Sequence, residues 1–456
     1  MGLEFEVIED YKGNKVIYCG KCSKIFEYSN KMEKILDGYD RNNQQMEQKL
    51  LPYFSVAEIH TYKEIVEKYL EECEKNAENF CKVQCKKVQE NRKYTTLWIN
   101  ISNDCNLRCI YCYGNGGSYN KDRALITMKK LVEILDFWLE HIDLKRKVLK
   151  VVFFGGEPLM NKEALKFVVN YLKSRISNET IILFEITTNG TILDDELLEI
   201  FSKNHFHITL SIDGGKEIQD FQRPFVNGKG SFLTLTKNLD AIRKKKIPVS
   251  ARLTVTHKNI SELLKCFQDI WSLGIANISF APVSTENSDL RLTPQDMDIL
   301  IKFIEQLGIF QYESIIQNKN IYVNNLFQFG KILHQNAMGI CSFYVSDVLK
   351  VDINGDIFKC HRLIGVDDFF IGNVTQGLIS ENNKNIYSAV HNCPTCNYSN
   401  ICIPCYEINY YANHDINIPD KEFCEFSKAI IKENIKLYVN LLRKLPEVAH
   451  KVYGKK

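Results

Sequence analysis

The chain has 456 residues, of which 45% are hydrophobic and 11% aromatic, and this composition supplies enough apolar surface for several buried cores. Such a length is typical of roughly three folding units. The 58 Lys and Arg residues nearly balance the 56 Asp and Glu residues, which leaves a formal charge of only +2. This balance gives no broad field that would attract nucleic acid or an anionic membrane, so neither is expected as a partner.

The N-terminus and the cysteine content indicate the compartment. No apolar run approaches the ~18 residues that span a bilayer. Four acidic residues stand within the first ten, where a secretory signal would be basic and then apolar. We therefore expect a cytoplasmic protein without a membrane segment. Its 16 cysteines would be reduced there, which favours metal or redox chemistry over a disulfide framework.

The first predicted unit comprises residues 1–93. Residues 5–11 and 15–28 have the composition of short strands, and residues 56–79 form a charged stretch with helical periodicity. The pattern predicts a small α+β domain.

The second predicted unit comprises residues 94–320, where strand-like runs alternate with helix-length segments. Thr127 is expected to cap the first of these helices, and its apolar face would carry Leu131, Leu135, Trp138 and Ile142. The regular alternation of strands and helices predicts an α/β fold with a parallel sheet. Because no dinucleotide-type glycine fingerprint is present, a closed or partly closed barrel is favoured. In a barrel the chemistry is expected at the carboxyl ends of the strands. The six predicted strands are residues 96–102, 148–154, 181–187, 206–212, 248–256 and 277–281.

The third predicted unit comprises residues 321–456. Its cysteines lie between short apolar segments, and the unit ends in a predicted amphipathic helix near residues 427–445. Such a segment is expected to need metal to hold its shape.

Three cysteines follow the first predicted strand of the barrel. Cys105, Cys109 and Cys112 are separated by three and by two residues. Thiolates are soft ligands that suit iron-sulfur clusters, and three of them on a four-iron cluster leave one iron open. A zinc site that lacks its fourth ligand, or three free thiols, are the alternatives from spacing alone.

This loop, with the aromatic Tyr111 before its third cysteine, resembles that of the radical S-adenosylmethionine (SAM) enzymes. The resemblance implies a partial (β/α)6 barrel and a [4Fe-4S] cluster that donates an electron to SAM. Cleavage of SAM would then yield a 5′-deoxyadenosyl radical that abstracts a substrate hydrogen.

Further motifs of that family follow successive predicted strands. Gly155, Gly156, Glu157 and Pro158 resemble the motif that holds the methionyl amino group of SAM, and the glycines would let the backbone approach the ligand. Asn189, Ser211 and Arg252 match positions near the ribose and carboxylate of SAM. An Asn-Gly turn, or an arginine that neutralises a buried carboxylate, would explain the same residues structurally.

The cysteines of the last third resemble those of a SPASM domain, which holds two auxiliary [4Fe-4S] clusters, so that three clusters are expected in all. A structural zinc domain is the alternative. The resemblance assigns two ligand sets. The outer thiol group is Cys393, Cys396, Cys402 and Cys424, and the inner thiol group is Cys341, Cys360 and Cys405.

The inner thiol group has only three members, so we hypothesise an open coordination site on its cluster. An open iron could hold a substrate thiolate where a carbon radical attacks it, which would favour thioether formation. The two residues between Cys402 and Cys405 differ from the commonest SPASM spacing of three, and resemble a subset of peptide thioether maturases.

His361 follows Cys360, where SPASM sulfatase-maturating enzymes carry an aspartate base. Formylglycine formation is therefore less expected. His361 is a candidate general base, or alternatively a hydrogen-bond donor to a cluster sulfide.

The resemblance implies a ribosomally made, cysteine-containing precursor peptide as substrate and an external electron donor of the flavodoxin or ferredoxin type. Carbon-carbon or carbon-oxygen cross-linking, oxidation of a single residue, and a non-catalytic iron-sulfur protein are the alternatives. Residues 1–93 resemble the winged-helix-like domains that bind a leader peptide by strand addition, or else form a structural cap. The remaining cysteines are expected to be free thiols, although the spacing of Cys19 with Cys22 and of Cys81 with Cys85 would also suit a metal. They are Cys19, Cys22, Cys73, Cys81, Cys85 and Cys266.

Overall fold

The computed structural model describes most of the chain, and for residues 73, 74 and 76–89 it describes only the backbone. Cys22 and the side chains of Cys73, Cys81 and Cys85 therefore lie outside what is described. The described ranges are 5–20, 23–89, 93–142, 146–335, 341–343, 347–379, 393 and 396–454.

The N-terminal domain is a three-stranded antiparallel sheet in the order β1-β2-β3, followed by three helices. The sheet and helices enclose their own apolar cluster, which includes Ile17, Leu36 and Met46. The expected run of residues 15–28 is two strands, and the third helix is longer than expected. The elements are β1 (Phe5–Glu9), β2 (Lys15–Cys19), β3 (Lys24–Glu27), α1 (Asn30–Gly38), α2 (Asn43–Leu50) and α3 (Val56–Gln89).

The main sheet confirms the predicted α/β fold with parallel strands. It has 11 strands in the order β10-β9-β8-β7-β6-β5-β4-β11-β12-β13-β14, and every neighbouring pair from β10 to β11 is parallel. The six predicted strands are β4 (Thr96–Ser102), β5 (Val148–Gly155), β6 (Ile181–Thr188), β7 (Phe206–Ser211), β8 (Val249–Val255) and β9 (Asn277–Pro282).

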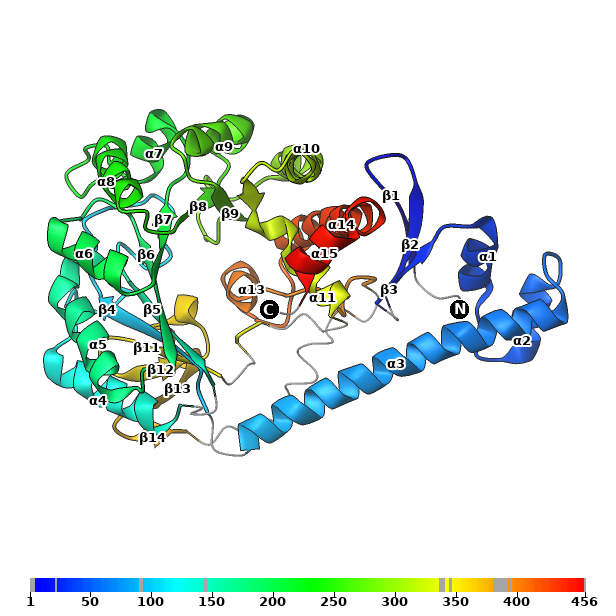
Figure 1. Cartoon of the computed structure of the whole chain (residues 1–456), viewed down its shortest axis with the longest axis horizontal. Helices are drawn as coiled ribbons and strands as arrows, with labels where there is room; N and C mark the ends of the chain where they lie inside the picture. Colours follow the sequence, from blue (N-terminus) through cyan, green and yellow to red (C-terminus); the bar gives the residue numbers. More distant parts are fainter. Residues whose placement is uncertain are drawn as a thin grey trace.

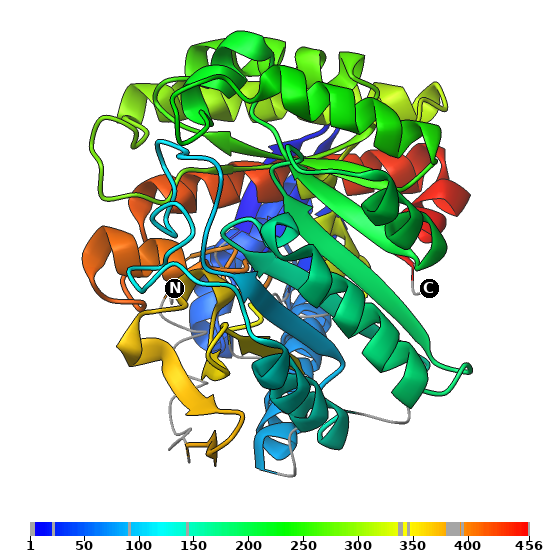
Figure 2. The ribbon, with the colours of Figure 1, turned by 90° about the vertical axis from the view of Figure 1, so that its left-hand side faces the viewer.

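The helices that follow these strands lie on the outer side of the curved sheet (Figure 2). In α4 (Met128–Glu140) the Thr127 side chain accepts a hydrogen bond from the Lys130 N–H, which confirms the predicted cap, and Leu131 and Trp138 are buried. The others are α5 (Lys162–Arg175), α6 (Asp195–Lys203), α7 (Lys216–Gln222), α8 (Phe232–Lys244), α9 (Leu263–Ser272) and α10 (Pro294–Ile316).

The chain after residue 320 adds strands to both edges of this sheet. β10 (Tyr322–Val323) pairs with β9 at one edge, and β11 (Val348–Val351) pairs with β4 at the other. β12 (Asp356–Phe358), β13 (Phe370–Asn373) and β14 (Gly377–Leu378) continue from β11 as antiparallel strands. These strands are too short to give a readable alternation of polar and apolar residues.

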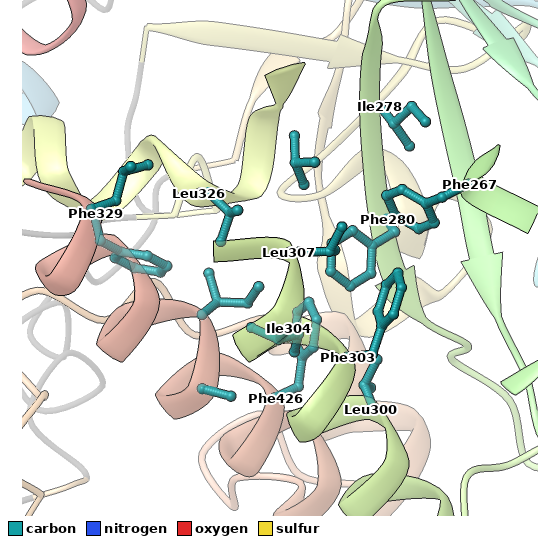
Figure 3. Packing of buried hydrophobic residues seen from close by; sticks show 14 of the residues in the cluster. Phe267, Ile278, Phe280, Leu300, Phe303, Ile304, Leu307, Leu326, Phe329 and Phe426 are labelled. Carbon is teal, nitrogen blue, oxygen red and sulfur yellow. The ribbon is translucent and has the colours of Figure 1, made fainter. Parts of the chain in front are cut away.

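The C-terminal helices join the barrel to the N-terminal sheet. They are α11 (Gln328–His334), α13 (Tyr406–Asn413), α14 (Lys421–Lys444) and α15 (Pro446–Tyr453). Figure 1 shows α14 and α15 between the two sheets. Figure 3 shows Phe426 of α14 directed toward Phe280 of β9, and their ring centroids are 5.6 Å apart. The same apolar cluster includes Val16 and Tyr18 of β2, so one core links all three regions.

No helix in the described ranges combines the length and the apolar character that a membrane crossing requires.

Candidate active site

A cavity of about 690 Å³ lies at the carboxyl ends of the parallel strands. Most of the predicted site residues line it, whereas Pro158, Cys360, Cys405 and the outer thiol group do not. Pro158 is buried at the start of the short helix η1 (Pro158–Asn161). The predicted residues in the lining are Cys105, Cys109, Tyr111, Cys112, Gly155, Gly156, Glu157, Asn189, Ser211, Arg252, Cys341 and His361.

The loop after β4 presents its cysteines with backbone N–H groups beside the sulfurs. The Leu107 N–H donates to the Cys105 Sγ at 3.4 Å, and the Gly116 N–H donates to the Cys112 Sγ at 3.3 Å. Such donors favour a charged thiolate over a neutral thiol. The donor set therefore fits an iron-sulfur cluster better than an apolar ligand.

Without a metal the thiols of Cys105 and Cys109 hold their protons. Burial raises the pKa of Cys105 and of Cys109 to about 12. A bound metal cluster would reverse this, because its positive charge favours the thiolate. No three Cys, His, Asp or Glu side chains within the described ranges converge on a point that suits a single metal ion.

The Gly155-Gly156 pair lets the end of β5 lie directly against the cysteine loop. Gly155 has φ +138°, and a Cβ at Gly156 would lie 2.3 Å from the Asp104 carbonyl oxygen. The Gly156 N–H donates to the Ser102 carbonyl and the Glu157 N–H to the Asp104 carbonyl, both at 2.8 Å. Any side chain at Gly156 would separate the two segments.

Glu157 is buried and fastens the end of β5 to that of β6. Its carboxylate accepts hydrogen bonds from the Thr188 hydroxyl at 2.7 Å, the Asn189 N–H at 2.8 Å and the Leu159 N–H at 3.0 Å. Burial raises the pKa of Glu157 to about 7, although these donors act in the opposite direction. Glu157 therefore fixes the loops on either side of the cavity.

Asn189 contacts the cysteine loop. Its Nδ2 donates to the Asn106 Oδ1 at 2.9 Å and lies 3.8 Å from the Cys105 Sγ, while its Oδ1 accepts from the Thr191 N–H at 2.9 Å. These bonds position Asn189 beside the loop, and its predicted contact with the SAM ribose stays a prediction.

Arg252 of β8 stands beside Ser211 of β7 in the register of the sheet, and both line the cavity. Among the described residues the Arg252 guanidinium has no hydrogen bond or ion pair. No carboxylate in that part of the chain is therefore neutralised by Arg252, as the structural alternative would require. Burial lowers the pKa of Arg252 to about 10, which leaves it a cation at neutral pH. Such a cation is suited to hold an anionic group.

Sequence reasoning missed Arg223, whose ion pair with Asp213 supports the cysteine loop. The Arg223 Nε donates to the Asp213 Oδ2 at 2.8 Å, and its Nη1 lies 4.0 Å from the Cys109 Sγ. The Tyr111 hydroxyl donates to the same Asp213 oxygen, which orients the aromatic residue of the motif. Asp213 lies two residues after the predicted Ser211, but no sequence pattern marked Arg223.

The members of the inner thiol group lie close to one another. The pKa of Cys360 rises to about 11, first because of burial and further because of the negative charges of Glu407 and Cys341. Burial, Glu407 and Cys341 also raise the pKa of Cys405. The assignment of these three residues to one cluster stays a prediction.

The members of the outer thiol group are also neighbours. Burial raises the pKa of Cys402 to about 12, and Cys424, Cys396 and Cys393 raise it further. The pKa of Cys424 rises to about 11, again by burial and then by Cys393. The four thiols therefore influence one another electrostatically, outside the lining of the main cavity, and their assignment to one cluster stays a prediction.

His361 packs in the wall of the cavity. Its ring stacks on Trp98 with centroids 4.0 Å apart, and the Phe154 ring lies edge-on at 5.4 Å. Burial, and then the charge of Arg362, lower the pKa of His361 well below its usual value, so the imidazole is neutral. No hydrogen-bond partner is found for it in the described part of the chain. Its role as a base stays a prediction.

Two further cysteines of the sequence are described. Cys19 is buried in β2, and Cys266 is buried in α9 against Gly214. Burial raises the pKa of Cys266 to about 12, which makes it an unreactive thiol.

The fold and this site define a class of enzymes with a parallel barrel and an open cysteine loop at its mouth. Residues 99–270 match the model of the Radical SAM superfamily. An uncharacterized protein of Methanocaldococcus jannaschii is 30% identical over 278 residues, which are 61% of this chain and 88% of that protein. The cysteine-type anaerobic sulfatase-maturating enzyme of Clostridium novyi is 25% identical over 353 residues, 73% of this chain and 93% of that enzyme.

Solved structures share the fold. The structure of anSMEcpe with bound AdoMet gives a TM-score of 0.66 at 18% identity and covers 78% of this chain and 97% of that one. Streptococcus suis SuiB bound to its precursor peptide SuiA gives 0.51 at 16% identity, with 92% and 98% covered.

The chain belongs to the radical SAM superfamily. It is an enzyme that modifies its substrate by radical chemistry, and SAM and an iron-sulfur cluster are its cofactors.

Proposed function

We propose that this enzyme is a peptide maturase that installs a sulfur-to-carbon thioether in a cysteine-containing ribosomal peptide. The observation that carries the proposal is the shared cavity, which is lined both by the cysteine loop after β4 and by Cys341 of the inner thiol group. A substrate in this cavity can meet the radical and a second metal centre together.

Three groups of thiols would hold three [4Fe-4S] clusters. The loop of Cys105, Cys109 and Cys112 would hold the first, and the inner and outer thiol groups would hold the two auxiliary clusters. When bound, the first cluster with SAM supplies a carbon radical that abstracts hydrogen, and the auxiliary clusters accept the surplus electron. An external donor of the flavodoxin or ferredoxin type would deliver the reducing electron.

The residues at the strand ends would bind SAM. Gly156 and Glu157 would face its amino group, Arg252 its carboxylate, and Asn189 and Ser211 its ribose. The free guanidinium of Arg252 supports this assignment, because a buried cation needs an anion. Trp98 and His361 would exclude water from this wall of the cavity, where a radical must be protected from side reactions.

A peptide substrate is supported by what the structural relatives bind. SuiB has been solved with the precursor peptide SuiA, and anSMEcpe with the Cp18Cys peptide. The N-terminal domain would bind the leader, because β3 is an edge strand of its sheet and an added strand could pair there. A structural cap is the other reading, and the contacts of this sheet with α14 support it equally.

Oxidation of a single residue, as the names of the sulfatase-maturating relatives indicate for those proteins, is the second candidate. The 25% identity with the enzyme of Clostridium novyi favours it. His361 argues against it, because it occupies the position of the expected aspartate base and is a neutral, stacked imidazole. Carbon-carbon and carbon-oxygen cross-links remain further outcomes of the same radical chemistry.

Mass spectrometry of a reacted peptide separates these products. The holoenzyme is incubated without oxygen with SAM, a reductant and a cysteine peptide encoded beside its gene, and Cys105→Ala serves as the control. A thioether removes two hydrogens and one alkylatable thiol. An unchanged thiol count would reject thioether formation, and an absence of 5′-deoxyadenosine above the control would reject the proposed radical role of the cysteine loop.

A further inference from the structure

Glu407 is a buried carboxylate beside the inner thiol group. It lies in the first turn of α13, two residues after Cys405, and is only 1% exposed. Its Oε2 accepts a hydrogen bond from the Cys405 Sγ at 3.6 Å and pairs with the Arg362 Nη1 at 2.7 Å. The carboxylate therefore lies in contact with one of the three thiols and with a cation.

The second oxygen of this carboxylate has no partner. The Glu407 Oε1 is buried and accepts no hydrogen bond from any described residue. An unpaired buried carboxylate oxygen is costly, because burial removes its water and nothing replaces it. Glu433 is equally buried and its Oε1 likewise accepts no hydrogen bond, but the Lys436 Nζ lies 2.7 Å from that oxygen and supplies a cation.

The local charge also lacks balance. With the inner thiols ionised, the four negative charges of three thiolates and one carboxylate would outnumber the nearby cations of the buried site, which are Arg362, Lys350 and Arg252. An arrangement of this kind is stable only when a further cation is bound. The group that would supply this charge is an iron-sulfur cluster, whose three thiolates leave one coordination position.

We propose that Glu407 is the fourth protein ligand of the inner auxiliary cluster in the resting enzyme, bound through its free carboxylate oxygen while the other oxygen keeps the Arg362 ion pair. This inference rests on the proposed function, because the inner cluster itself is part of that proposal. Oxygen is a harder ligand than sulfur and suits such a cluster less well. In the resting enzyme the Glu407 carboxylate would then occupy the coordination position that we propose for the substrate sulfur. Because this carboxylate is a readily exchanged ligand, the substrate thiolate could replace it.

Electron-nuclear double resonance tests this ligand directly. The full-length chain carries Cys105→Ala, Cys109→Ala and Cys112→Ala, so that only auxiliary clusters contribute, and is produced with carboxyl-¹³C-labelled glutamate. After anaerobic reconstitution with iron and sulfide, the reduced protein should show a ¹³C coupling to the cluster. Glu407→Ala should abolish this coupling. Glu433→Gln, which alters another buried carboxylate, should preserve it.

Iron content separates the possible failures. Two auxiliary clusters correspond to about eight iron atoms per chain. Full iron content without a ¹³C coupling would overturn the ligand role of Glu407 and leave the three-cluster proposal intact. About four iron atoms, unchanged by Cys360→Ala, would overturn the inner cluster and the inference together. If Glu407→Ala fails to assemble, Glu407→Cys supplies a thiolate instead, and it should retain the iron and lose the coupling.

Discussion

The backbone N–H of Gly20, at the end of β2, donates a hydrogen bond of 2.7 Å to the Oδ1 of Asn397. Asn397 lies between Cys396 and Cys402, on the segment that carries the outer thiol group. The Gly20 carbonyl accepts a second bond from the Asn400 Nδ2 at 3.1 Å. A Cβ at Gly20 would lie 1.9 Å from the Asn397 carbonyl oxygen. The N-terminal sheet is therefore attached directly to the segment that carries the outer thiol group.

Removing this contact should loosen the N-terminal domain. We expect Asn397→Ala to cost about 1–3 kcal/mol, because it leaves the buried Gly20 N–H without an acceptor. Limited trypsin digestion of the apoprotein should then cleave within residues 1–93 faster than in the parent. Asn178→Ala, in an exposed turn, is the matched control. Equal cleavage of the two variants would show that other contacts hold the domain.

The buried ion pair of Asp213 and Arg223 should contribute more to the free energy of unfolding than an exposed ion pair with the same distance between its charged atoms. Arg223→Met leaves Asp213 buried without its cation, and we expect a loss of about 3–5 kcal/mol in the free energy of unfolding. Lys216→Ala removes the exposed 2.8 Å pair with Asp220 and should cost about 0.3–0.5 kcal/mol. Urea unfolding of the apoproteins measures both values. A cost for Arg223→Met as small as that of the control would contradict the supporting role of the pair.

A side chain at Gly156 should impair binding of SAM. Its Cβ would collide with the Asp104 carbonyl and the Gly117 Cα, at 2.3 and 2.7 Å. Such overpacking costs about 1–3 kcal/mol, and we expect a roughly tenfold or larger loss of SAM affinity for Gly156→Ala. Equilibrium dialysis of the reconstituted enzyme measures the affinity. Gly228→Ala, whose Cβ would meet nothing within 4 Å, should bind SAM like the parent.

Glu157 should give the apoprotein a measurable pH dependence. Its pKa is raised from 4.5 to about 7 in the folded state, so between these values the folded chain binds a proton that the unfolded chain has released. The free energy of unfolding should therefore fall as pH rises from about 4.5 to about 7, by roughly 3 kcal/mol. Glu157→Gln removes this contribution. Denaturant titrations at several pH values give the change of the unfolding free energy with pH for the parent and for Glu157→Gln. The same pH dependence in both proteins would refute the raised pKa of Glu157.

Local patterns in the sequence predicted much of the fold. The strands β4 to β9 were found within two residues of their ends, because each buries alternating or continuous apolar residues between turn signals. The Thr127 cap was found because capping depends on neighbours in the chain. Strand β10 was missed because its two residues carry no period.

The spacing of Cys105, Cys109 and Cys112 identified the cysteine loop, because these ligands come from one short segment whose spacing the sequence shows directly. Only the tertiary structure brought Arg223 to Asp213, Arg362 to Glu407 and Gly20 to Asn397. These pairs come from different elements, and a contact that chain folding creates between distant segments leaves no periodic trace in the sequence. The sequence by itself thus determined the chemistry of the cysteine loop, whereas the packing of the sheets and the C-terminal helices decided which charges and hydrogen bonds surround the thiol groups.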